Sequence, residues 1–161
     1  MHKYLDAASF VLLIVILVFT GFALYGSHQL PGRIPTHFDS LGVADTWTTR
    51  SSYELLPFLA VIVYLGLTVV SAFSWLAKHK AEMDTEGVPG LEVLILKLIS
   101  WVKLELIATF TYVQISSIQE VRHQQVASSS LGWWILLAAL LVTIAWHVTK
   151  MLQVASAEES L

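Results

Sequence analysis

Long apolar runs separated by short polar stretches dominate the pattern along the chain. The first run, residues 8–26, carries no charged side chain and is long enough to cross ~30 Å of hydrocarbon as a helix. A secretory signal would have a shorter apolar core, of about 7–15 residues, followed by a small-residue cleavage site. We therefore interpret this run as a retained anchor.

Three further apolar runs lie at residues 55–77, 91–118 and 131–151. Pro57 suits the first turn of the second helix, because the N–H that proline lacks would have no partner there. The pattern predicts an all-α membrane protein, a four-transmembrane-helix bundle formed as a single integral domain over residues 1–161. The connecting segments are an outer loop (27–54), an inner loop (78–90), a second outer loop (119–130) and a tail (152–161).

Basic residues near the helix ends indicate the orientation, because cytoplasmic segments carry an excess of lysine and arginine. With a cytoplasmic N-terminus, the inner side carries Lys3, Lys78, Lys80 and Lys150, and the outer side carries Arg33, Arg50 and Arg122. This bias favours cytoplasmic N- and C-termini.

Composition agrees with a lipid environment and excludes several classes of function. Hydrophobic residues make up 56% of the chain and charged residues 13%, too little charge to cover a water-soluble domain of this size. The net charge of −3 comes with no basic stripe, which argues against a nucleic-acid partner. Because the chain has no cysteine, disulfides, thiolate metal sites and cysteine nucleophiles are excluded.

The segment between the first two runs is polar and turn-rich, with two prolines that restrict the residues before them. We expect Leu30 and Ile34 to be extended and the stretch from Asp39 to Gly42 to turn. The segment is too short to hold a core of its own. It therefore predicts two short extended pieces folded back over the helix ends as a small cap.

The residues of this segment follow the order LPxxIPxHFxxxGxxDxWxxR from Leu30 to Arg50. This order closely resembles the signature of a bacterial membrane family of unknown function, a module that forms the N-terminal part of SdpI-type immunity and signalling proteins. The resemblance runs from about Leu12 to Ser71, and Arg50 stands where the family usually has lysine.

The resemblance implies a protein of the bacterial cytoplasmic membrane. For SdpI-type proteins it implies protection against a secreted toxic peptide and retention of a transcriptional repressor at the membrane. We therefore expect a non-catalytic protein whose outer loop recognises a peptide or protein partner. The residues expected at that surface are His37, Phe38, Asp39, Asp45, Trp47 and Arg50.

Two other classes of function stay open. One is an accessory subunit of a larger membrane complex that contacts a cofactor or lipid. The other is a metal-dependent membrane hydrolase, since His37, Asp39 and Asp45 offer one imidazole and two carboxylates. The alternative for His37 and Asp39 is that they bond loop backbone and shape the cap. We find no nucleophile elbow, Gly-rich phosphate loop or paired catalytic carboxylates, so we expect neither an enzyme nor a bound cofactor.

The third run carries polar residues on one helical face: Lys97, Trp101, Glu105, Thr109, Tyr112 and Ser116. Glu105 falls near the middle of the membrane, where an ionised carboxylate is expensive. We expect it to point into the bundle and bond hydroxyls of Tyr64, Thr68 or Thr143, either as part of a polar pocket or as a packing lock.

Two other polar residues are interpreted from their positions in the predicted helices. Lys103 lies on a different face from Glu105, and we expect it to extend back toward the cytoplasmic interface. His147 is a conceivable ligand of haem or a pigment, and the alternative is an ordinary interfacial histidine beside Trp146.

Overall fold

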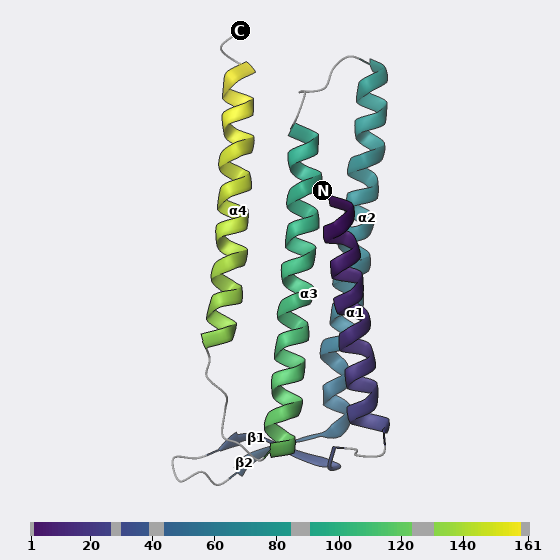
Figure 1. The fold of residues 1–161 in the computed structure, drawn as a ribbon, viewed down its shortest axis with the longest axis vertical. Coiled ribbons are helices and arrows are strands. Elements are labelled where there is room, and N and C mark those ends of the chain that lie inside the picture. The colour runs from purple at the N-terminus through teal and green to yellow at the C-terminus, as the bar shows by residue number, and fades with distance from the viewer. Residues whose placement is uncertain (1, 27–29, 39–43, 85–90, 124–130, 159–161) are drawn as a thin grey trace.

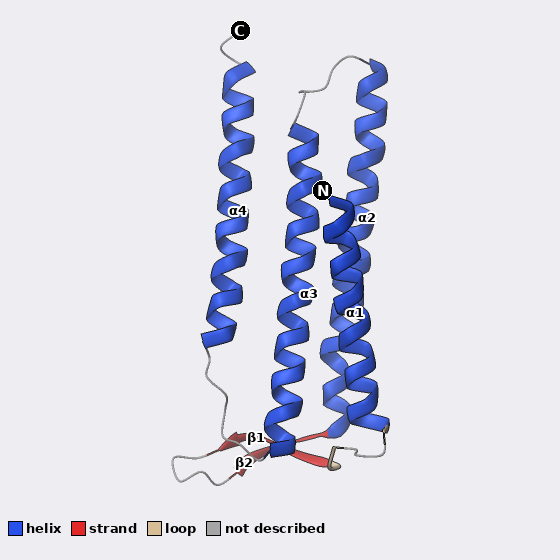
Figure 2. Cartoon of the chain, in the orientation of Figure 1, coloured by secondary structure: helices blue, strands red, loops and turns tan. Residues whose placement is uncertain are grey.

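Four helices and one β-hairpin make up the computed structural model, which describes residues 2–26, 30–38, 44–84, 91–123 and 131–158 (Figure 1). Helical structure dominates, as the apolar pattern predicts, and the cap adds a small two-stranded sheet (Figure 2). The elements are α1 (His2–Tyr25), β1 (Arg33–Phe38), β2 (Ala44–Thr49), the 3₁₀ helix η1 (Arg50–Glu54), α2 (Leu55–Asp84), α3 (Leu91–His123) and α4 (Leu131–Glu158).

Among the described residues, three stretches of helix are long and apolar enough to cross a membrane: Lys3–Tyr25, Arg50–Ser74 and Trp134–Ala157. Large apolar side chains such as Phe22, Phe73 and Val142 are exposed on them. In water such surfaces would drive aggregation, whereas lipid solvates them at no cost. The three spans therefore indicate a membrane protein.

The helix α3 is the element on which the others pack. It contacts α1, α2 and α4, and in Figure 1 it stands between α4 on one side and α1 with α2 on the other. Of the six buried polar or charged residues in the described parts of the chain, four belong to α3: Ser100, Lys103, Thr111 and Gln114. The polar helix is thus enclosed by the apolar ones, as expected when lipid is the solvent.

The helices extend beyond the apolar runs that are predicted to cross the membrane. α1 begins at His2, and α2 continues to Asp84 through part of the expected inner loop at 78–90. α3 continues to His123 and α4 to Glu158, into the expected outer loop and tail. The reason is that lysine, glutamate, glutamine and alanine are good helix formers, so a helix need not end where its apolar run ends.

The hairpin confirms the expectation of two extended pieces folded back over the helix ends. β1 and β2 pair antiparallel, with Arg33 opposite Thr49 and Pro35 opposite Trp47, and the register shifts around His37. The expected turn from Asp39 to Gly42 lies outside the described residues.

Two apolar residues fasten the hairpin to the helices. Leu30 and Ile34 are buried in a cluster with Ala23 and Leu24 of α1 and Ile118 of α3. The backbone N–H of Leu30 also donates to the carbonyl of Ala23 at 2.9 Å. Proline at the next position disfavours helical backbone at both residues, and the extended chain turns their side chains onto the bundle.

Replacing Ile34 with alanine should loosen the hairpin. Ile34 is 0% exposed, and an isoleucine-to-alanine change at a core site costs about 2–5 kcal/mol. We expect faster proteolysis within the hairpin, measured by mass spectrometry of limited digests. The matched control is Ile62→Ala on α2, where the side chain is 50% exposed to the surroundings and the digestion rate should stay that of the parent protein. Equal digestion of both variants would contradict the anchoring role.

Candidate functional site

The hairpin gathers most of the residues expected at a partner-binding surface. His37 and Phe38 end β1, Asp45 and Trp47 lie on β2, and Arg50 begins η1. In the register, His37 pairs with Thr46 and Phe38 with Ala44, so the backbone positions lie on facing strands. Asp39 lies outside the described residues.

The β2 strand presents an exposed aromatic side chain beside a row of hydroxyls. Trp47 is 54% exposed, and Thr46 and Thr49 are exposed on either side of it. Hydroxyls at the end of β2 bond to those of η1, with Thr48 and Ser52 oxygens 2.6 Å apart. An indole offers large contact area and one N–H donor, which suits recognition of another polypeptide.

Hydrogen bonds beneath the hairpin set its position relative to the helices. The Nε2 amide of Gln114 on α3 donates to the Tyr53 carbonyl in η1 at 2.9 Å and to the Thr20 hydroxyl of α1 at 3.1 Å. The Tyr25 hydroxyl donates to the Glu54 carboxylate. The backbone N–H of Arg50 closes the base of the hairpin by donating to the Gly32 carbonyl at 3.2 Å. Contacts with α1 and α3 therefore fix the position of the hairpin.

The metal hypothesis stays a prediction, because the structure describes neither Asp39 nor the side chains of His37 and Asp45. Across the described residues there is no group of three or more histidine, aspartate or glutamate side chains that would hold a metal ion. Asp39, one of the three residues considered for a metal, lies outside them. His147 has its Nδ1 atom 2.9 Å from the Thr143 carbonyl one helical turn away, a local bond common for a polar residue on a helix.

The polar residues that the sequence analysis places in the membrane divide into two groups rather than one. Thr143 of α4 donates to the Glu105 Oε1 atom at 2.6 Å, while Oε2 is buried with no hydrogen-bond partner in the described structure. Tyr64 and Thr68 of α2 lie instead against Lys103. Glu105 thus faces α4, and Lys103 faces α1 and α2.

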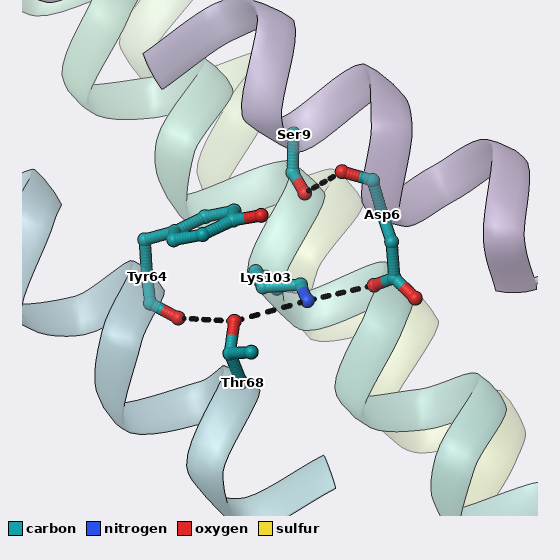
Figure 3. Close-up of polar contacts among 5 residues, drawn as sticks. All are labelled: Asp6, Ser9, Tyr64, Thr68 and Lys103. Atoms are coloured by element: carbon teal, nitrogen blue, oxygen red, sulfur yellow. Dashed lines mark hydrogen bonds and ion pairs between the residues drawn. The ribbon is translucent and has the colours of Figure 1, made fainter. Parts of the chain in front are cut away.

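The expectation that Lys103 extends back to the interface is wrong. Its side chain is 3% exposed, and Nζ lies 2.7 Å from the Asp6 Oδ1 atom of α1 (Figure 3). Nζ also donates to the Thr68 hydroxyl at 3.4 Å and sits 5.1 Å from the centre of the Tyr64 ring. Because α1 begins at His2, Asp6 is helical and reaches the level of Lys103, and a neutralising partner replaces the need for water.

Local bonds prepare the groups around this ion pair. The Thr68 hydroxyl donates to the Tyr64 carbonyl at 2.7 Å, so its oxygen lone pairs are free to accept from Lys103. The buried Ser9 hydroxyl donates to the Asp6 carbonyl at 2.9 Å. The Asp6 carboxylate neutralises the buried Lys103 ammonium. The Thr68 hydroxyl and the face of the Tyr64 ring stabilise that ammonium further.

Sequence reasoning missed Asp6 and Gln114. No signal in the pattern pointed to Asp6, because it precedes the first apolar run whereas Lys103 lies well inside the third. Nothing in the pattern singled out Gln114, because it lies off the polar face that contains Glu105.

Breaking the ion pair from one side should cost more than removing both charges. Asp6→Leu alone leaves a buried ammonium uncompensated, which typically costs about 3–5 kcal/mol, and Lys103→Met alone leaves the carboxylate unpaired, whereas the double variant Asp6→Leu/Lys103→Met leaves no charge. We expect the double variant to unfold at a higher temperature than either single variant, measured by thermal unfolding in mild detergent. Additive losses would show that the two residues act independently.

The bond between Thr143 and Glu105 should survive an isosteric change. Glu105→Gln keeps an acceptor for the Thr143 hydroxyl, whereas Glu105→Leu removes it and should weaken the contact between α3 and α4. A double-mutant cycle with Thr143→Val should give a coupling of about 0.6 kcal/mol, the average for such bonds between membrane helices. A coupling of zero with Glu105→Leu would mean that the bond adds nothing to packing.

Residues 12–61 match a protein family described as Domain of unknown function (DUF1648). The matched region covers the C-terminal half of α1, the hairpin, η1 and the beginning of α2, so it contains the whole Leu30-to-Arg50 motif and its anchors. A search among curated proteins and a search among solved structures each found no match.

Proposed function

We propose that this chain is a non-catalytic membrane protein that recognises a peptide or protein partner through its hairpin. The observation that carries the proposal is Trp47, a large aromatic residue 54% exposed on a strand whose base is held by buried residues. An exposed tryptophan on a positioned element binds with little loss of conformational freedom, because the surface is preorganised.

The form of the hairpin favours an extended polypeptide as the partner. Each strand of a two-stranded sheet pairs with its neighbour along one edge and has a second edge for further pairing. An extended peptide can add to such an edge through backbone hydrogen bonds, with Trp47 supplying a side-chain contact. The resemblance to SdpI-type proteins supports an immunity or sensing role for this recognition.

We also propose that the chain lies in the bacterial cytoplasmic membrane. All four helices cross, with the hairpin on the outer side and both termini in the cytoplasm. Support for α3 as the fourth crossing helix comes from its contacts with α1, α2 and α4, each of which contains one of the apolar spans. The lysine bias toward the termini and the α2–α3 connection supports the orientation.

An accessory subunit of a larger membrane complex is the second candidate, and one feature of α4 favours it. α4 packs against α3 but makes no extensive contact with α1 or α2, and Trp134, Ile135 and Val142 are all largely exposed. A partner subunit would cover this surface in place of lipid. Native mass spectrometry of the untagged protein distinguishes the two candidates, because a subunit co-migrates with larger chains and a receptor does not.

Replacing Trp47 and Arg50 together with alanine should abolish partner capture while expression in the membrane stays normal. The measurement is photo-crosslinking in intact cells followed by mass spectrometry of the captured chains. The matched control replaces two exposed residues of the same strand, Thr46→Ala/Thr49→Ala, and should retain capture. An identical set of captured chains from the Trp47/Arg50 variant would refute recognition by the hairpin.

A further inference from the structure

The buried ion pair lies away from the hairpin and plays no part in the proposed recognition. A lysine ammonium that is 3% exposed inside a membrane protein needs an anion in contact with it. Its surroundings on α2, the Tyr64 ring and the Thr68 hydroxyl, stabilise a cation but do not neutralise it. The packing of α2 against α3 therefore provides a position for one anion in contact with the Lys103 Nζ atom.

The carboxylate now in that place is less enclosed than the ammonium that it contacts. The Asp6 side chain is 32% exposed, against 3% for Lys103. Asp6 also lies close to the start of α1, four residues after His2, which is about 6 Å at ~1.5 Å per residue.

The neighbouring helices run much farther in the same direction. α2 continues from Thr68 to Asp84, about 24 Å, and α3 reaches back from Lys103 to Leu91, about 18 Å. Figure 1 shows the N-terminal end of α1 well short of those ends. α2 and α3 therefore extend past the ion pair in this direction.

The charged and titratable groups that face the pair are few in the described structure. They are Asp6 itself on α1, the Tyr64 ring on α2 and Lys103 on α3. Glu105 lies on the other side of α3, where it accepts a hydrogen bond from the Thr143 hydroxyl of α4. Asp6 is thus the carboxylate that Lys103 contacts, and no described second acid stands beside it to take its place.

We infer that Lys103, Thr68 and Tyr64 form a binding site for a small oxyanion, a carboxylate or a phosphate group, which the Asp6 carboxylate occupies as a tethered ligand. The ammonium supplies the charge, and the Thr68 hydroxyl positions it. An anionic lipid headgroup and a free anion share this chemistry.

The test removes the tethered ligand and offers a free one. In Asp6→Gly, and in the milder Asp6→Ser, we expect a lower unfolding temperature in neutral detergent than in the parent protein. Sodium formate, at constant ionic strength set with chloride, should restore most of that loss in a saturable way. Parallel samples in phosphatidylglycerol and phosphatidylcholine vesicles without formate show whether a headgroup phosphate does the same, which distinguishes the lipid source from the free anion.

Two controls make the result specific to the site. Asp6→Gly/Lys103→Met lacks the ammonium and should show no response to formate. Glu105→Gly removes a carboxylate that contacts a hydroxyl rather than an ammonium, and formate should not raise its unfolding temperature. If the Asp6 variants respond to neither formate nor anionic lipid, or respond equally without Lys103, the inference is wrong.

Discussion

The rest of the structure depends on one constraint: the polar groups of α3 have to be kept from lipid. Lipid offers no hydrogen bonds, so each buried donor, acceptor or charge on this helix needs a partner from protein. α1 and α2 supply Asp6, Tyr64 and Thr68 to Lys103, and α4 supplies Thr143 to Glu105. The apolar helices are arranged around α3 because they carry the partners that its polar residues require.

The same constraint links the helices to the hairpin. Gln114, near the hairpin end of α3, uses its amide group to bond α1 and η1 together. Leu30 and Ile34 pack against apolar residues of α1 and α3 at the same end of the helices. A surface that recognises another molecule gains from such rigid support, because a loose loop would lose conformational freedom on binding. The region matched by the family of unknown function contains the hairpin and its anchors but not α3, so the support comes partly from outside that module.

Much of this architecture can be predicted from local sequence signals. The apolar runs show where the helices lie, and the prolines after Leu30 and Ile34 predict the extended backbone that turns both side chains onto the bundle. The hydroxyl partner of Glu105 was among three candidates because residue counting gives depth along a helix. Depth does not give rotation, however, so Tyr64 and Thr68 were assigned to Glu105 when they face Lys103. Asp6 was overlooked because it precedes the first apolar run, and its partner is set by tertiary packing between residues almost a hundred positions apart.

The enclosure of α3 by the other helices is tested most directly by cysteine accessibility, since the chain has no cysteine of its own. Single variants Thr111→Cys, at a buried position, and Arg122→Cys, at an exposed one, are treated in membranes with a water-soluble maleimide from either side. The account predicts rapid labelling at position 122 and none at position 111 until the protein is denatured. Labelling of both positions at similar rates in the native membrane would contradict it.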